Sequence, residues 1–222
     1  MPGVGTGSGA VKGPGIGAGK GLLLVMSGPS GVGKGTLCQI LMQQNPQIVS
    51  TISVTTRSPR LGETDGVEYY FVDEKRFDEL RRRGAFLEWA MVHDNFYGTL
   101  AAEVEELRQK EYDVILEIDV QGAEQVRGAI ADGVFIFILP PSMEELLERI
   151  QGRGTDSAEV IQRRFAAARK ELMEVLKYDY AVENDTIPQA VKEIEGIILA
   201  EKCRVQRNKK ILADFIEKGD VS

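Results

Sequence analysis

One short segment, GPSGVGK at residues 28–34, restricts the possible folds of this chain more than any other. An apolar run, Leu22 to Ser27, comes directly before it, and an amphipathic helical pattern follows it until Asn45-Pro46. The N–H groups of a Gly-rich turn that opens a helix converge on a phosphate group. A strand, this turn and a helix in that order therefore predict a phosphate-binding loop in an α/β protein.

Further apolar runs extend this prediction. The segments 114–118 and 134–139 are continuously apolar or nearly so, as strands buried on both faces of a sheet are, and each is followed by a helical pattern. Strands that alternate with helices predict a parallel sheet core flanked by helices. An apolar stripe from Ile161 to Leu176 predicts one of the later helices.

Composition excludes several classes of partner. The chain has 27 Lys and Arg against 34 Asp and Glu, a formal net charge of -7, which argues against nucleic acid or an anionic membrane as partner. No apolar run reaches the roughly 20 residues of a membrane span, and the N-terminus lacks the pattern of a signal peptide. The two cysteines, Cys38 and Cys203, have no metal-binding spacing. We expect a cytoplasmic protein, and nothing in the sequence indicates its oligomeric state.

The chain divides into segments of different composition. We expect a disordered Gly-rich tail at 1–19, a single domain at 20–205 and a C-terminal extension at 206–222. Within the domain we expect a core formed by 20–52, 100–148 and 166–205, an inserted substrate lobe at 53–99 and a LID at 149–165. The tail contains an imitation of a phosphate loop at 15–20, but Pro14 stands where the first glycine is needed and no strand precedes it.

The phosphate loop itself departs from the usual pattern. Lys34 is expected to place its charge on the β- and γ-phosphates of ATP. The pattern then requires Ser or Thr to hold Mg²⁺, whereas this chain has Gly35 followed by Thr36. The ion that accompanies ATP could then be held by phosphates and water, as Mg²⁺ often is. The residues expected to bind ATP in this segment are Gly28, Pro29, Ser30, Gly31, Val32, Gly33, Lys34, Gly35 and Thr36.

A second phosphate-binding element is predicted at TTRSPR, residues 55–60. Arg57 and Arg60 flank a proline that stiffens the loop, and two guanidinium groups can grip one phosphate from two directions. An Arg pair alone is more often a solvated surface. The surrounding segments favour the functional interpretation.

With these segments in view, the chain resembles guanylate kinase, a P-loop nucleoside monophosphate kinase, from about residue 21 to residue 202. The resemblance depends on motifs in the family's order: the phosphate loop, TTRSPR, FLEWA at 86–90, YGT at 97–99, EIDVQG at 117–122 and GRGTD at 152–156. It implies transfer of the ATP γ-phosphoryl group to GMP in purine nucleotide metabolism, with Mg²⁺ as cofactor and these two nucleotides as partners.

The resemblance also implies roles for particular residues. Those implied to bind GMP are Ser53, Arg57, Arg60, Tyr69, Glu88, Tyr97, Thr99 and Asp119. Those implied to act on the transferring phosphate are Lys34, Arg57, Arg149, Arg153 and Arg164, with Asn184 beside adenine. Glu117 stands where the family usually has Asp and is the residue from which a protein contact to Mg²⁺ would come. His93, the only histidine, is given no catalytic role.

The chemistry of guanine supports two of these assignments independently. Its ring N–H and exocyclic amine lie on one edge, where a carboxylate such as Glu88 can accept both, whereas adenine presents an acceptor there. A hydroxyl such as that of Thr99 can donate to the 6-oxo group, which adenine lacks.

Two alternatives remain open at this point. GKGT at 33–36 also resembles the phosphate loop of adenylate kinase, and guanylate-kinase-like domains also serve as catalytically silent peptide-binding modules. Glu88 argues against the first alternative, and the intact Lys34 and arginines argue against the second.

Overall fold

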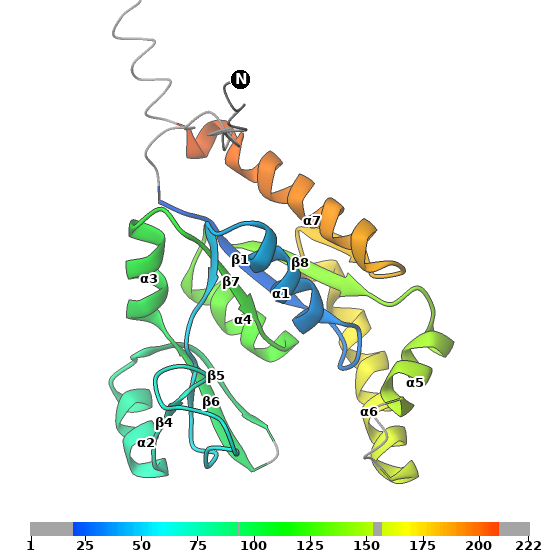
Figure 1. Cartoon of the computed structure of the whole chain (residues 1–222), viewed down its shortest axis with the longest axis horizontal. Helices are drawn as coiled ribbons and strands as arrows, with labels where there is room; N and C mark the ends of the chain where they lie inside the picture. The colour runs from blue at the N-terminus through cyan, green and yellow to red at the C-terminus, as the bar shows by residue number, and fades with distance from the viewer. Residues whose placement is uncertain (1–19, 93, 153–156, 209–222) are drawn as a thin grey trace, which may run out of the picture.

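The computed structural model describes residues 20–92, 94–152 and 157–208. Its centre is a sheet of five parallel strands with helices on both faces (Figure 1). In spatial order the strands are Ile48–Ser50 (β2), Asp113–Glu117 (β7), Leu23–Ser27 (β1), Val134–Leu139 (β8) and Tyr180–Glu183 (β9). The predicted α/β fold and its three predicted strands are confirmed. The edge strands β2 and β9 were not predicted, because three or four residues are too few to show an apolar period.

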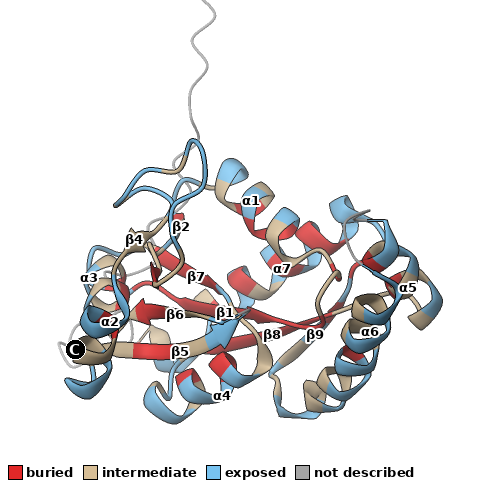
Figure 2. Ribbon diagram, turned by 90° about the horizontal axis from the view of Figure 1, so that it is seen from below, coloured by how far each residue is buried: buried red, intermediate tan, exposed pale blue. Residues whose placement is uncertain are grey.

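The central strand divides the core between two layers of helices. Leu24 and Met26 face the side covered by Lys34–Gln44 (α1) and Ile187–Lys202 (α7). Leu23 and Val25 face the side covered by Ala101–Gln109 (α3) and Val120–Ala129 (α4). All four side chains are completely buried, and the buried residues follow the strands of the sheet (Figure 2). Each such burial contributes about 1.5–3 kcal/mol.

A second, smaller sheet lies beside the first. It has the order β4-β3-β6-β5, formed by Tyr70–Phe71 (β4), Val54–Thr55 (β3), Asn95–Leu100 (β6) and Phe86–Val92 (β5), with the helix Glu74–Arg82 (α2). Asp73 caps the first turn of α2 by accepting from the N–H of Arg76. Phe77 on this helix stacks on Phe86 at 4.5 Å and on Phe96 at 5.2 Å between ring centroids. This aromatic cluster fixes α2 to the small sheet.

An arm of two helices, Met143–Gln151 (α5) and Ala158–Leu172 (α6), continues into the 3₁₀ turn Met173–Lys177 (η1). The apolar stripe predicted for α6 is wrong at its end, because the helix stops at Leu172 and Leu176 is fully exposed. The arm leads back toward β9 and α7. Within the described ranges, no helix is long and apolar enough to cross a membrane.

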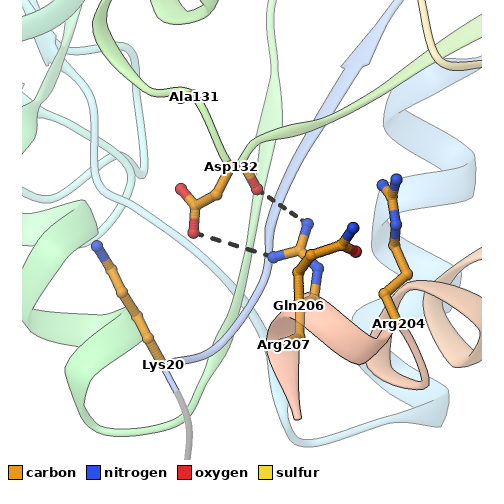
Figure 3. A pocket seen from close by; sticks show the side chains of 6 residues that line it. All are labelled: Lys20, Ala131, Asp132, Arg204, Gln206 and Arg207. Atoms are coloured by element: carbon orange, nitrogen blue, oxygen red, sulfur yellow. Dashed lines mark hydrogen bonds and ion pairs between the residues drawn. The ribbon is translucent and has the colours of Figure 1, made fainter. Parts of the chain in front are cut away.

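The amino ends of β1 and β8 meet the C-terminal part of the domain. Arg207, on the 3₁₀ turn Val205–Arg207 (η2), donates to the carbonyl of Asp132 at 3.0 Å (Figure 3). Its guanidinium group also lies 3.1 Å from the carboxylate of Glu201. Glu201 is 2% exposed and also accepts the hydroxyl of Tyr180 at 2.6 Å. These bonds fasten the end of α7 to the sheet. A shallow cavity of about 380 Å³ remains between Lys20, Arg207 and their neighbours, at the end of β1 that lies opposite the phosphate loop.

Candidate active site

The predicted phosphate loop connects β1 to α1. Its glycines Gly28, Gly31 and Gly33 have φ values of 143°, 90° and 97°, which L side chains rarely adopt. Space excludes a side chain as well, because a Cβ at Gly28 would lie 2.4 Å from the carbonyl oxygen of Ile138. The predicted need for glycine in this turn is confirmed.

Lys34 is the first residue of α1 and curls back over the loop. Its Nζ donates to the carbonyls of Gly28 at 2.6 Å and Pro29 at 3.2 Å. Burial lowers the pKa of Lys34 from the ordinary lysine value, and nearby carboxylates, led by that of Glu117, oppose this shift. The lysine, the loop backbone, Thr36 and Glu117 line a cavity of about 310 Å³. This cavity presents backbone N–H groups and an ammonium group to a phosphate chain.

Helix α6 contacts the loop at Ser30. Arg164 donates from Nη2 to the hydroxyl of Ser30 at 2.8 Å. Two turns further along the same face, Glu171 lies close enough to the loop for the backbone of Ser30 to oppose the rise of its pKa. Burial raises the pKa of Glu171, and the charge of Lys34 opposes that shift. Sequence reasoning missed Glu171, and the only available signal was its seven-residue spacing from Arg164.

The other residues predicted on the ATP side lie in different surroundings. Arg149 pairs with Glu145 and donates to the carbonyl of Asn184 at 3.0 Å, so the structure links it to the end of β9. Arg153 and His93 lie outside the described residues. The predicted tail at 1–19 also lies outside them, so of the imitation loop at 15–20 only Lys20 is described.

Asn184 contacts the backbone of the phosphate loop through its side chain. It is 4% exposed, and its side-chain amide donates to the carbonyl of Val32 at 2.8 Å. A Cβ at Gly33 would approach this amide nitrogen to 2.5 Å. In this structure Asn184 holds the loop backbone, and its contact with adenine stays a prediction.

A second cavity, of about 350 Å³, lies between the small sheet and the carboxyl end of β7. It collects five of the eight residues predicted to bind GMP, which are Ser53, Tyr69, Glu88, Tyr97 and Asp119. Glu117 lines this cavity as well as the phosphate-loop cavity. The two predicted nucleotide sites therefore share a wall.

Glu88 is the buried carboxylate of this second cavity. It is 7% exposed and accepts the hydroxyl of Thr99 at 2.6 Å. Burial raises the pKa of Glu88, with a smaller contribution in the same direction from the charge of Asp119. A Cβ at Gly122 would lie 2.9 Å from Glu88 Oε2, so a side chain at this position would clash with the carboxylate.

Thr99 orients the carboxylate of Glu88. It is 1% exposed and donates its hydroxyl proton to Glu88, which it faces across the strand pair β5 and β6. The pattern YGT alone could not indicate this contact. The donation from Thr99 to a purine oxygen stays a prediction.

The TTRSPR loop is organised by a residue that sequence reasoning did not assign. Glu63 accepts from Arg57 Nη2 at 2.9 Å and from the N–H of Arg60 at 2.7 Å. The guanidinium group of Arg57 lies 5.4 Å from the ring centroid of Tyr69, a residue that lines the second cavity. Arg57 is thus held beside this cavity, while Arg60 remains exposed.

Asp119 follows β7 directly and caps α4. Its carboxylate accepts the N–H of Gly122 at 2.8 Å. The cap fixes Asp119 at the carboxyl end of the parallel strands, where ligands bind in open α/β sheets. Asp119 therefore lines the second cavity together with Glu117.

The fold and these paired cavities define a P-loop nucleoside monophosphate kinase, with a phosphate loop after the central strand and a second substrate site against a small sheet. Comparison with known proteins gives the particular family. A family model described as guanylate kinase matches residues 20–201, and the chain belongs to the guanylate kinase family.

Similar proteins agree with this membership. The chain is 50% identical over 195 residues to guanylate kinase of Clostridioides difficile (strain 630), covering 88% of this chain and 95% of that protein. It is 54% identical over 187 residues to guanylate kinase of Desulfitobacterium hafniense (strain Y51), covering 84% and 94%. The crystal structure of guanylate kinase from Anaplasma phagocytophilum matches with a TM-score of 0.68 at 36% identity, covering 85% of this chain and 90% of that one.

Proposed function

We propose that this chain transfers the γ-phosphoryl group of ATP to GMP, giving ADP and GDP in purine nucleotide metabolism. The observation that carries the proposal is the shared wall at Glu117, which lines both the phosphate-loop cavity and the cavity around Glu88. Two nucleotide sites with a common wall bring a donor and an acceptor phosphate together. Relatives about half identical to this chain carry the name guanylate kinase.

The transfer is direct and in line. A phosphate oxygen of GMP is already a nucleophile, so the reaction requires no general base and no covalent enzyme intermediate. Catalysis comes from positioning and from neutralising the charge on the transferring group. Lys34 and Arg164 supply positive charge beside the phosphate loop, and the backbone N–H groups of the loop hold the β- and γ-phosphates.

The acceptor phosphate binds on the other side of the shared wall. Glu63 and the ring of Tyr69 already hold Arg57 beside this cavity. Arg60 follows it on the same loop and completes a two-sided grip on the phosphate. We assign these contacts to GMP.

Guanine is read by Glu88. Its carboxylate accepts the ring N–H and the exocyclic amine together, and these donors replace the water that burial removed. Thr99 holds the carboxylate in place, and Ser53 and Asp119 line the same cavity. Adenine leaves the buried carboxylate facing an acceptor, so AMP is rejected.

Mg²⁺ fits the residues present in the phosphate-loop cavity. The carboxylate of Glu117 and the hydroxyl of Thr36 line it, and Mg²⁺ prefers oxygen ligands. The described part of the chain contains no group of three or more His, Cys, Asp or Glu side chains that could hold a metal, which favours an ion carried mainly by ATP and water. When bound, Mg²⁺ neutralises charge on the β- and γ-phosphates.

The two alternative functions receive less support. The family match and the buried Glu88 disfavour an adenylate-type kinase. The positions of Lys34 in the phosphate-loop cavity, of Arg164 against Ser30 and of Arg57 beside Tyr69 disfavour a silent peptide-binding module.

A coupled assay of ADP release, run with GMP and AMP side by side and with and without Mg²⁺, tests the proposal. We expect turnover with GMP and Mg²⁺ and little with AMP. Lys34→Met should lower kcat by about 10²- to 10³-fold, the effect of removing one preorganised charge-stabilising donor, with the thermal unfolding profile retained. Equal turnover of AMP would support the adenylate-type alternative. Near-normal turnover by the Met variant would overturn the assignment of Lys34.

A further inference from the structure

The two departures from the expected phosphate-site pattern, Gly35 and Glu117, lie against each other. A Cβ built on Gly35 would be 3.2 Å from Oε2 and 3.4 Å from Oε1 of Glu117. A Ser or Thr side chain at position 35 would therefore crowd the carboxylate, which would have to shift by a few tenths of an ångström. Both residues line the phosphate-loop cavity.

Glu117 also stands in an unusual electrostatic position. Its carboxylate lies in the wall between two cavities that we assign to phosphate groups, where like charges repel. Among the described residues no ion pair to Glu117 is found, and the Nζ of nearby Lys34 donates to two loop carbonyls. A carboxylate between two anionic substrates requires a cation, and the divalent cation carried by ATP would meet this need.

We infer that Gly35 and Glu117 are an exchanged pair, in which the carboxylate of Glu117 lies against position 35 and supplies the Mg²⁺-binding oxygen that a hydroxyl at position 35 would otherwise provide. Gly35 has no side chain, so the longer acidic residue at 117 can reach over the start of α1. A shorter Asp at 117 would draw back by one methylene and leave room for a hydroxyl at 35. The inference rests on the proposed use of ATP with Mg²⁺.

Binding of a non-hydrolysable ATP analogue by calorimetry, with EDTA and with Mg²⁺, tests this inference in the full chain. Glu117→Gln keeps the shape and removes the charge. It should bind the analogue more tightly than wild type in EDTA, because repulsion is lost. The Mg²⁺ enhancement is the affinity for the analogue with Mg²⁺ divided by the affinity with EDTA. In Glu117→Gln this ratio should fall about tenfold or more, the scale of metal-supporting interactions. Glu195→Gln, an exposed change on α7, is the matched control and should alter neither quantity.

The second part of the test is a double-mutant cycle. Gly35→Ser should lower the Mg²⁺ enhancement because its side chain displaces the Glu117 carboxylate, and Glu117→Asp should lower it because the carboxylate draws back. The double variant Gly35→Ser/Glu117→Asp should recover most of the enhancement. Thermal unfolding of each variant establishes that it is folded.

The outcomes separate this inference from the proposed function. Wild type without any Mg²⁺ enhancement would overturn the proposed Mg²⁺-ATP use and the inference with it. Wild-type enhancement combined with unchanged enhancement in Glu117→Gln would overturn the exchanged pair alone. A double variant that shows the sum of the two single losses would also overturn it.

Discussion

Replacing Glu88 by Gln should weaken GMP use and stabilise the fold at the same time. Glu88 is 7% exposed and accepts the hydroxyl of Thr99 at 2.6 Å. Gln has the same shape, and its amide oxygen can still accept from Thr99. Its amide nitrogen, however, carries donors that face the donors of guanine. The variant therefore loses at least one charge-assisted hydrogen bond, which is about 1.5–3 kcal/mol. At 1.4 kcal/mol per tenfold, we expect kcat/KM for GMP to fall about 10- to 100-fold.

The expected effect on stability has the opposite sign. Burial raises the pKa of Glu88, so the folded protein disfavours its ionised form more than the unfolded chain does. The stability from this group is complete below the ordinary glutamate pKa of about 4.3 and is lost as pH rises through the folded-state pKa. Glu88→Gln does not titrate. Its Tm should exceed that of wild type at neutral pH, and the difference should shrink toward zero in acid.

Two measurements check this pair of expectations. A coupled ADP-release assay gives kcat/KM for GMP and the KM for ATP, which should stay unchanged, and thermal scanning over a pH series gives the Tm difference. Glu74→Gln, an exposed change on α2, serves as control in both. A lower Tm at neutral pH for Glu88→Gln, or unchanged kcat/KM for GMP, would refute the reasoning.

Three further variants probe other parts of the site. Asp119→Ala removes the cap of α4 and should lower the free energy of unfolding by about 1 kcal/mol. Asp119→Asn retains a capping side chain and should lower it much less. Equal losses in denaturant titrations would contradict the capping role. Gly122→Ala should raise the KM for GMP about tenfold, because its Cβ would lie 2.9 Å from Glu88 Oε2. The KM for ATP should stay unchanged. Parallel changes in both constants would contradict this expectation. Arg164→Ala should lower kcat about 10²-fold with little change in the KM for GMP, and a steady-state assay showing normal kcat would exclude its assigned role.

Much of the fold was predictable from local sequence. The strands β1, β7 and β8 were predicted because residues buried on both faces form continuous apolar runs. The edge strands β2 and β9 and the end of α6 were not. Their conformation depends on pairing and packing with distant segments, as the full exposure of Leu176 illustrates.

For the active site, the sequence by itself determined the phosphate loop and predicted the residue types that we propose to read a guanine nucleotide. Glycines with positive φ and a lysine at a helix start are consequences of local backbone geometry. Only the tertiary structure decided which side chains meet. It gave the proton of Thr99 to Glu88, brought Glu171 to Ser30, and placed Glu117 over Gly35. These partners are separated along the chain, and their proximity follows from how the helices and strands pack, which no local pattern encodes.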